Sequence, residues 1–306
     1  MEDLKNKIHV SVFMPVYNGA SYIGQQIDSI LSQTCPVEKI FIQDDGSTDG
    51  TYAIVHNRSE SDTIVLTKNN VNLGVVGNIK NGIKAFLDHH YLALADQDDV
   101  WLPEKLALYR EKMKSLESDN DGNLPCLVYS DQAIINERGQ LVADSFWTQN
   151  GHDKFSHCLE TLLFTNFVTG CATLMNPSMI SHLSKMPEIK GVYHDAWIAL
   201  IAFSIGKAGK IDQPLVLHRQ HENSLTLSQS KRRSLYSRLR THVDSFKAPE
   251  AFLENQFDLI ERFFKTYRSL LPSDKKELFE KTLSYRKKSF LRKKIWIYHY
   301  YKKHKT

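Results

Sequence analysis

The sequence predicts an α/β fold, in which a mixed, mainly parallel sheet is flanked by helices and followed by a C-terminal helical appendage. Three observations support this fold class. Short apolar segments alternate with helical patterns over the first hundred residues, and polar clusters follow several of those segments. From about residue 225 the composition changes to helical segments rich in Lys and Arg. Alternating strands and helices are typical of a parallel sheet.

The first elements of this sheet follow one another closely. Residues 8–18 predict a buried strand that stops at Pro15. The helix that follows carries its apolar residues at a helical spacing, and these are Ile23, Ile27, Ile30 and Leu31. The next elements alternate, with strands expected at 37–43, 62–69 and 91–95 and helices at 51–57 and through Ile79 and Ile83.

The second half of the chain is less regular. The patterns predict helices at 103–117 and 194–206 and strands at 126–135, 167–176 and 210–221. Pro103 suits the first turn of its helix, and Gly206 ends the other. We expect two regions, an α/β domain at 1–225 and a helical, basic C-terminal region at 226–306.

The composition of the 306 residues fits one large globular domain, or one domain with an appendage. No apolar run is long enough to span a membrane, and the N-terminus has no signal-peptide pattern. The four cysteines are far apart and form no CxxC pair, which is typical of reduced thiols in the cytoplasm.

Charge is distributed unevenly along the chain. Residues 281–306 contain ten Lys or Arg and no Asp or Glu, so the other 280 residues carry a net charge of −6. Because aromatic residues interleave with these basic ones, we expect the tail to bind the anionic inner face of a membrane. The alternative is that the tail forms a helix that packs on the α/β domain and exposes its basic face to solvent. Nucleic acid is a weaker candidate and is not expected.

The segment "ADQDDVW" places Asp96, Asp98 and Asp99 directly after a buried strand. Like charges at that spacing repel, and burying them is costly unless a positive charge compensates. The nearest basic residue is Lys105, beyond Pro103. We therefore expect the compensating charge to come from outside the protein, as Mg²⁺ or Mn²⁺ bridging a substrate diphosphate. A solvated loop is the alternative.

Polar residues also follow the first two strands. Tyr17 and Asn18 follow the first strand, and Asp44 and Asp45 follow the second. In an open α/β sheet, ligands bind at the carboxyl ends of the strands. Taken alone, "DDGSTDG" is as consistent with a tight turn and helix capping, but three clusters at successive strand ends favour a site.

Six segments occur in order: "VSVFMPVYNGASYI", "IQDDGSTDGT", "NNVNLG", "ADQDDVWLPEKL", "HDAW" and "HRQHENS". Together they resemble family 2 glycosyltransferases, which adopt the Rossmann-like GT-A fold, over roughly residues 8–224. Within these segments, "DQDDVW", "HDAW" and "RQH" more narrowly resemble the bacterial rhamnosyltransferase-like branch of the family. The Q-x-x-R-W sequence of the processive membrane members is absent, so we expect transfer of one or a few sugars.

The resemblance implies roles for individual residues. Asp45 would contact the base of a nucleoside diphosphate sugar, Asp96 the ribose, and Asp98 a divalent metal ion. The full donor-binding set is Pro15, Tyr17, Asn18, Asp44, Asp45, Asn72, Gly74, Asp96, Asp99 and Arg219, with Asp98 and His221 as metal ligands. For Arg219 and His221, a surface position without a role is equally consistent with the sequence.

Asp195 is the candidate catalytic base. An inverting transfer needs a carboxylate to take the proton of the acceptor hydroxyl, and the family pattern has its base here. The alternative is that His194 and Asp195 only begin a helix. A helix N-terminus would lower the pKa of this carboxyl group and keep it ionised.

These expectations combine into a cytoplasmic, peripheral membrane glycosyltransferase of the EC 2.4 class. It would move L-rhamnose from dTDP-L-rhamnose to a lipid-linked saccharide in the synthesis of bacterial surface polysaccharide such as O-antigen or capsule. The same chemistry with a UDP-hexose or UDP-N-acetylhexosamine is the first alternative. A Mg²⁺-dependent phosphohydrolase and an inactive nucleotide-sugar-binding subunit are more distant ones.

Overall fold

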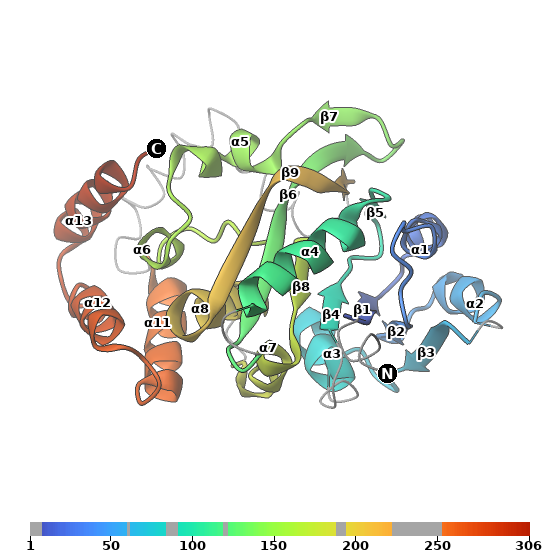
Figure 1. The fold of residues 1–306 in the computed structure, drawn as a ribbon, viewed down its shortest axis with the longest axis horizontal. Coiled ribbons are helices and arrows are strands. Elements are labelled where there is room, and N and C mark those ends of the chain that lie inside the picture. Colours follow the sequence, from blue (N-terminus) through green and yellow to red (C-terminus); the bar gives the residue numbers. More distant parts are fainter. Residues whose placement is uncertain (1–7, 60–61, 84–90, 119–121, 188–193, 222–252) are drawn as a thin grey trace.

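The computed structural model describes residues 8–59, 62–83, 91–118, 122–187, 194–221 and 253–306. Figure 1 shows a central sheet with helices on both of its faces. The C-terminal helices, coloured orange to red, lie at the opposite end of the molecule from α1 and α2. The predicted fold class is confirmed.

Nine strands form one mixed sheet within the described residues. They are β1 (Val10–Val16), β2 (Ile40–Asp44), β3 (Ile64–Lys68), β4 (Tyr91–Leu94), β5 (Val100–Trp101), β6 (Cys126–Asn136), β7 (Leu141–Ala143), β8 (Thr173–Met175) and β9 (Lys207–Gln220). The order is β3-β2-β1-β4-β8-β6-β9-β5, with β7 paired to β6. The β3-β2-β1-β4 half is parallel, whereas β8 runs antiparallel to both β4 and β6.

Helices cover both faces of this sheet. They are α1 (Ile23–Leu31), α2 (Thr51–His56), α3 (Gly74–Ile83), α4 (Lys105–Glu117), α5 (Phe146–Asn150), α6 (Leu159–Leu162), α7 (Pro177–Ser181), α8 (His194–Ile205), α11 (Glu254–Tyr267), α12 (Ser273–Ser284) and α13 (Phe290–Lys303). Three short 3₁₀ turns, η2 (His152–Lys154), η3 (Gly170–Ala172) and η4 (Leu183–Lys185), complete the elements.

Helix α1 forms where its apolar spacing predicted it. Ile23, Ile27 and Ile30 are fully buried against the sheet, whereas Leu31 is 45% exposed. At 100° per residue, Leu31 is turned well away from the centre of the buried stripe. The prediction that all four residues share the buried face was therefore wrong for Leu31.

The first strand continues one residue beyond the predicted stop at Pro15. Strand β4 pairs only with residues Val10 to Phe13 of β1, so Pro15 has a partner strand on the β2 side alone. A proline lacks the backbone N–H, which a strand flanked on both sides would need. The open side of β1 therefore accommodates it.

The predicted strand at 167–176 is mostly not a strand. Only Thr173–Met175 pairs in the sheet as β8, and Gly170–Ala172 forms the 3₁₀ turn η3. The Thr173 hydroxyl donates to Gly170 O at 2.6 Å, which closes this turn. This difference matters below, because the turn lies in the candidate site.

The apolar core has two parts, and the C-terminal helices belong to one of them. Leu259, Ile260 and Phe263 of α11 and Phe279 of α12 are buried in the same apolar cluster as Trp197 of α8. The appendage therefore shares a core with the sheet domain. The expected boundary near residue 225 lies outside the described residues.

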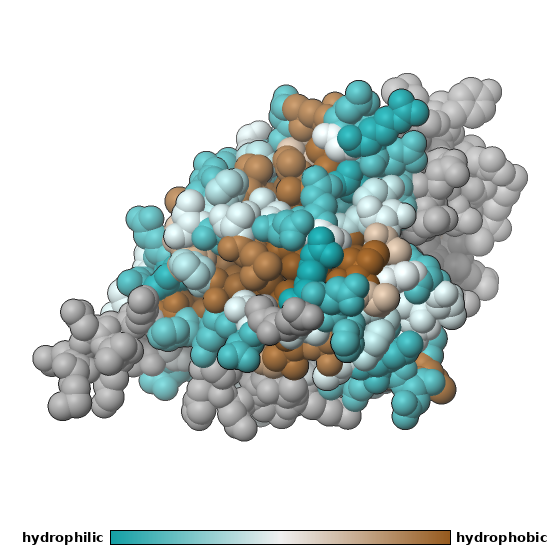
Figure 2. All heavy atoms as spheres, turned by 90° about the vertical axis from the view of Figure 1, so that its right-hand side faces the viewer, coloured by the Kyte–Doolittle hydropathy of each residue, from teal (hydrophilic) through white to brown (hydrophobic). Residues whose placement is uncertain are grey.

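Viewed from the end that carries β3, the surface has a band of hydrophobic residues between hydrophilic ones (Figure 2). Edge strand β3 has only β2 as a neighbour, so one of its sides is unpaired in the sheet. Among the described residues, no helix is both long and apolar enough to cross a membrane.

Candidate active site

The strand order reverses at β1, and this places the predicted clusters along one edge. Strands β2 and β4 flank β1 in parallel, so Tyr17, Asp45 and Asp96 all follow carboxyl ends at this edge. Gln97 links two of these ends: its amide accepts from Tyr17 N at 2.8 Å and donates to Tyr17 O at 3.0 Å. The sheet topology thus brings together segments that are 80 residues apart.

The loop after β1 is also tied to the loop after β2. Asn18 has a φ of 48°, in the left-handed region that its short polar side chain tolerates. Its backbone N donates to the Ser47 hydroxyl at 3.0 Å, and its side-chain oxygen accepts from Thr48 N at 2.9 Å. The phenol of Tyr17 is left exposed beside this junction.

Asp45 organises the loop that precedes α3. Its buried carboxylate accepts from the Asn69 side chain at 2.7 Å, from Leu73 N at 2.8 Å and from Gly74 N at 2.9 Å. Asn72 also accepts from Gly74 N, at 3.0 Å. Because Gly74 has a φ of +71°, a side chain there would strain this turn.

Asp44 points inward at the end of β2 and is fully buried. One carboxylate oxygen accepts from Ser47 N at 2.8 Å, and the other lies 4.0 Å from Lys68 Nζ. Asp44 therefore fixes the turn after β2, and Asp45 is the member of the pair that faces the 69–74 loop.

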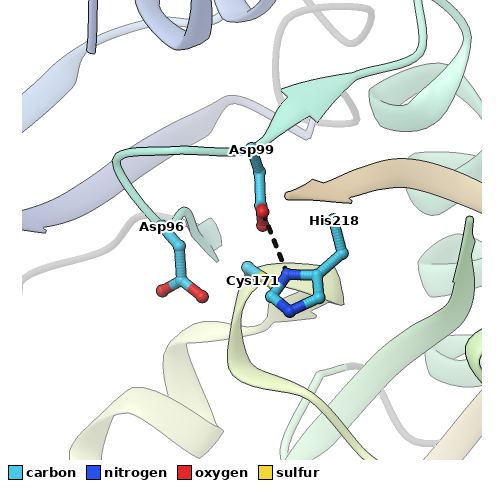
Figure 3. A group of neighbouring side chains, drawn as sticks. All are labelled: Asp96, Asp99, Cys171 and His218. Atoms are coloured by element: carbon cyan, nitrogen blue, oxygen red, sulfur yellow. Dashed lines mark hydrogen bonds and ion pairs between the residues drawn. The ribbon is translucent and has the colours of Figure 1, made fainter. Parts of the chain in front are cut away.

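In the acidic run, Asp99 is paired with a histidine of β9. Asp99 is fully buried, and it accepts from His218 Nδ1 at 3.0 Å and from Arg219 N at 3.1 Å. Burial opposes the charge on His218, but the Asp99 carboxylate prevails and raises the pKa of His218 to about 9. Figure 3 shows the two side chains directed at one another, with Asp96 and Cys171 beside them.

Asp98 is paired in the same way at the more open end of the run. His221 Nε2 lies 2.8 Å from Asp98 Oδ2, and each side chain is 15% exposed. The ring of Tyr22, just before α1, lies 5.1 Å from the His221 ring and 4.7 Å from the Arg219 guanidinium. Asp98 and His221, predicted as metal ligands, are thus brought together.

Arg219 is buried rather than on the surface. Its Nε donates to Asp98 O at 2.8 Å, Nη2 to the Gln25 side chain at 2.7 Å, and Nη1 to the carbonyls of Asn136 and Glu137 at 3.3 Å each. Every nitrogen of this guanidinium therefore bonds to protein oxygen, and the Asp98 backbone is held in place by it.

Part of the compensating charge comes from the protein, contrary to the expectation from the sequence. Besides His218, Lys105 lies behind the run with its Nζ 2.7 Å from Cys171 O and 3.4 Å from the Trp101 ring centroid. Complete burial lowers the pKa of Lys105 to about 7, although Asp99 and Asp96 oppose the shift. His218 reaches the run from a distant strand, whereas Lys105 is the basic residue nearest to it in the sequence.

One group of side chains here could hold a metal ion. Ligand atoms of Asp96, Asp99, Cys171 and His218 all lie within 4.8 Å of one another. However, burial raises the pKa of the Cys171 thiol well above its usual value, and His218 is engaged as the cationic partner of Asp99. A protonated thiol and an imidazolium are poor ligands for a hard cation.

Asp96 differs from its neighbours because it lacks a cationic partner as close as theirs. Burial, reinforced by the charges of Asp99 and Asp98, raises the pKa of Asp96 to about 7. The nearby His218 opposes this shift. An added cation would therefore be stabilised here, since the local charge is still negative.

Asp195 lies in the first turn of α8 and accepts from Ala196 N at 2.7 Å. Burial raises the pKa of Asp195 to about 6, so the prediction that the helix N-terminus lowers it was wrong. Desolvation outweighs the helix terminus here. A carboxylate with a pKa near 6 is a stronger base than an ordinary one.

Turn η3 lies between the start of α8 and the acidic run. A Cβ at Gly170 would lie 2.3 Å from His194 Nε2, so only glycine allows η3 to pack on the start of α8. Cys171, the next residue, belongs to the group around Asp99. Burial lowers the pKa of His194 to about 4, which keeps its imidazole neutral.

The sequence reasoning missed several residues that build the site. His218 stands in the same "HRQH" segment as His221, so the motif contained the signal, but nothing in it showed which histidine meets which carboxylate. Gln97 and Asn69 gave no signal, because their roles depend on contacts with distant segments. Lys105 was noted as the nearest basic residue, but the sequence did not show that it lies behind the run.

Comparison with known proteins now identifies the family. The model described as glycosyl transferase family 2 matches residues 11–175, which contain the first four of the six segments. The chain belongs to glycosyl transferase family 2.

The chain is similar to individual members of this family over different lengths. The chain is 26% identical over 230 residues to the putative teichuronic acid biosynthesis glycosyltransferase TuaG of Bacillus subtilis, covering 72% of this chain and 83% of that one. It is 26% identical over 195 residues to the Escherichia coli UDP-Glc:alpha-D-GlcNAc-diphosphoundecaprenol beta-1,3-glucosyltransferase WfgD, covering 63% and 69%. With chondroitin synthase of Pasteurella multocida it shares 30% identity over 149 residues, which span 48% of this chain and only 15% of that protein.

The fold is similar to that of a solved enzyme. The crystal structure of S. aureus TarS 1-349 in complex with UDP-GlcNAc superposes with a TM-score of 0.61, at 16% identity, covering 91% of this chain and 72% of that one. At this identity the likeness concerns the fold alone. Because the alignment reaches most of the chain, it supports the GT-A architecture as a whole.

Proposed function

We propose that this protein is an inverting, metal-dependent glycosyltransferase that uses a UDP-sugar and elongates a lipid-linked saccharide. The observation that carries the proposal is the single edge of the sheet at which the loop after β1, the Asp45 loop, the Asp96–Asp99 run and the start of α8 meet. Family membership supplies the reaction class.

The donor would bind at the strand ends. Asp45 fixes the 69–74 loop against which the base would lie, with the exposed Tyr17 ring on the other side. Pro15, Asn18 and Asp44 shape the same pocket from behind. Asp96, without a cation of its own, faces the ribose side, and Asp99 supports the sugar side through its bond to His218.

Asp98 and His221 are the proposed metal ligands. They lie 2.8 Å apart at the more open end of the acidic run, where water and a diphosphate have access. A carboxylate and a neutral imidazole suit Mn²⁺ or Mg²⁺ better than the buried group around Cys171. A divalent cation held by Asp98 and His221 would supply positive charge to offset that of a leaving diphosphate. Arg219 acts indirectly, because it positions the Asp98 backbone.

Asp195 is the proposed base. It would accept the proton from the acceptor hydroxyl while that oxygen attacks the anomeric carbon from the face opposite the diphosphate. The C–O bond to the diphosphate breaks as the new glycosidic bond forms, so the configuration inverts. Burial raises the pKa of Asp195 to about 6, which strengthens it as a base and still leaves most of it ionised at neutral pH.

The donor proposal departs from the dTDP-L-rhamnose expectation. WfgD is named for UDP-glucose and a diphosphoundecaprenol acceptor, and WfaP, 35% identical over 98 residues, carries the same description. These names favour the alternative, a UDP-hexose or UDP-N-acetylhexosamine, over the rhamnosyl branch. A saccharide on a polyprenyl diphosphate in surface polysaccharide synthesis is the acceptor that fits them.

Thermal unfolding with nucleotides tests this proposal directly. We expect UDP with Mn²⁺ to raise the melting temperature more than dTDP with Mn²⁺, and EDTA to remove most of the difference. Asp98→Asn is the matched variant, because it should lose the dependence on Mn²⁺ and keep its fold. Equal or greater stabilisation by dTDP would restore the rhamnosyl reading, and the absence of any nucleotide effect would contradict the function.

A further inference from the structure

The C-terminal helices present a surface that the proposed reaction does not use. Helix α13 packs on the body of the protein through Trp296, whose ring stacks on Tyr285 at 4.0 Å between centroids and meets Phe164 edge-on at 4.8 Å. On the outer side, Leu291 is 64% exposed, Ile295 48% and Tyr298 64%. These three residues are spaced at i, i+4 and i+7, so they form one apolar stripe along the helix.

The basic residues of this region divide into two groups. Arg286 is committed to the body, because its guanidinium bonds to Glu254, Asp258 and Glu261 of α11 at 2.9, 2.7 and 2.6 Å. Lys293 is buried and is also committed, with its Nζ 3.5 Å from Glu254. These two contacts hold the end of α12 and helix α13 to α11, whose apolar residues are part of the core.

The second group faces solvent. Lys288 and Arg292 are exposed and form no ion pair in the described part of the chain. Five more exposed basic residues of this region are Lys281, Lys287, Lys302, Lys303 and Lys305. Since residues 281–306 contain no acidic side chain, the outward-facing charge of this region is uniformly positive.

An open pocket lies where the exposed basic residues meet the apolar stripe. It has a volume of about 460 Å³ and is lined by Tyr285, Lys288, Arg292, Ile295, Trp296 and His299. Lys288 and Arg292 give it two cations suited to a phosphate oxygen. Ile295, which also belongs to the exposed stripe, gives it an apolar wall. The pocket therefore suits a phosphate group attached to something apolar.

We propose that one surface of this region binds an anionic phospholipid membrane. We name it the outer face of α13, and it consists of Leu291, Arg292, Ile295 and Tyr298 together with Lys288, just before the helix. The two cations would contact lipid phosphates while the apolar stripe enters the interfacial layer, as in other amphipathic helices that lie on a membrane. A lipid headgroup occupies the pocket. This inference does not depend on the donor or on any catalytic residue named above.

The aromatic packing favours a membrane over nucleic acid as the partner. Bases bind to proteins by stacking on exposed aromatic faces, but the Trp296 ring is already stacked on Tyr285 and is almost fully buried, which leaves Tyr298 as the single aromatic ring of the outer face. An exposed stripe with leucine and isoleucine gives no advantage with a phosphate backbone. It does give one at a lipid interface, where burial of apolar surface adds to charge attraction.

Vesicle flotation of the full chain tests the proposal. The protein should float with phosphatidylcholine vesicles that contain phosphatidylglycerol, should bind vesicles of phosphatidylcholine alone far less, and should bind less as salt screens the charges. Lys288→Gln with Arg292→Gln should lower the partition coefficient about thirtyfold, the loss expected for two charges at an anionic surface.

Two further variants separate the effect of the Lys288 and Arg292 charges from that of apolar contact and from that of the overall net charge. Leu291→Ser with Tyr298→Ser should lower binding at every salt concentration, since both side chains are exposed and neither supports the fold. Lys114→Gln with Arg138→Gln, which removes the same charge from exposed positions outside the C-terminal helices, should leave binding unchanged. Thermal unfolding and UDP binding of all three variants should match the parent protein.

Other outcomes would overturn the proposal. Equal losses in the Lys114 and Arg138 control would show that net charge alone drives binding. Stabilisation by inorganic phosphate beyond chloride of the same ionic strength, lost in Lys288→Gln with Arg292→Gln and without vesicle binding, would assign the pocket to a free phosphate compound. Binding of a single-stranded oligonucleotide without vesicle binding would assign the face to nucleic acid.

Discussion

Two pairs of adjacent aspartates lie at the same edge of the sheet, and the protein treats their charges differently. The charges of Asp44 and Asp45 are met mainly by amide hydrogens: Ser47 N, Leu73 N, Gly74 N and the Asn69 side chain. Asp98 and Asp99 are met by the imidazoles of His221 and His218. The first pair therefore shapes a loop, and the second contacts side chains that can exchange a proton or bind a metal ion.

This difference separates architecture from chemistry. Amide donors are fixed by the chain and do not change with pH or ligands. A carboxylate whose hydrogen bonds come from amides therefore has a structural role. An imidazole can lose its proton or bind a metal ion instead. A site that must take up a cation and a diphosphate is better built from the second kind of pair.

The largest expected effect is at Asp98. Asp98→Asn should lower turnover on the order of a thousandfold, because the metal ligand that offsets several kcal/mol of developing charge is weakened. The melting temperature should change little. Enzyme assays with and without EDTA measure this, and added Mn²⁺ should restore the chelated parent enzyme. Full activity of the variant in EDTA would remove Asp98 from the chemistry.

Asp195 gives the next effect, and it extends the comparison to a carboxylate that accepts from one amide, Ala196 N, and has no ion pair within the described residues. Asp195→Asn should lose about a hundredfold or more in turnover while UDP affinity is kept. In the parent enzyme, turnover should fall as pH drops below about 6, because burial raises the pKa of Asp195 to about 6 and only the ionised form accepts a proton. An unchanged acid limb in kcat would contradict the assignment.

Asp45 should affect stability more than chemistry. Asp45→Asn removes the charge that accepts three hydrogen bonds, and we expect a loss of roughly 2 kcal/mol in the free energy of unfolding. Chemical denaturation measures it, with Asp98→Asn as the paired control. If Asp98→Asn proves the more destabilising of the two, the distinction between a structural pair and a chemical pair fails.

The smallest effect is a pH dependence of stability that comes from His218. The pKa of His218 is raised from 6.5 to about 9 by Asp99, against the cost of burial, so its contribution is full below pH 6.5 and is lost as pH rises through 9. The melting temperature of the metal-free protein should fall over that range, and His218→Gln should flatten the profile. A flat profile in the parent protein would mean that the pair is not charged.

Most of the fold followed from local pattern. The alternation of strands and helices predicted the parallel half of the sheet, and the spacing of Ile23, Ile27 and Ile30 predicted α1. The pattern failed at Gly170–Ala172, which form a 3₁₀ turn that packs closely on His194 and is closed by the Thr173 hydroxyl. The period of apolar residues does not record such a contact.

For the candidate site, the sequence by itself determined which side chains stand at the strand ends, since motif residues and strand boundaries are both local. Only the tertiary structure decided how their charges are balanced. Lys105, His218 and Arg219 reach the acidic run from a buried helix position and from a strand more than a hundred residues away. The raised pKa of Asp195 has the same origin, because desolvation depends on everything packed around a group and not on its neighbours in the chain.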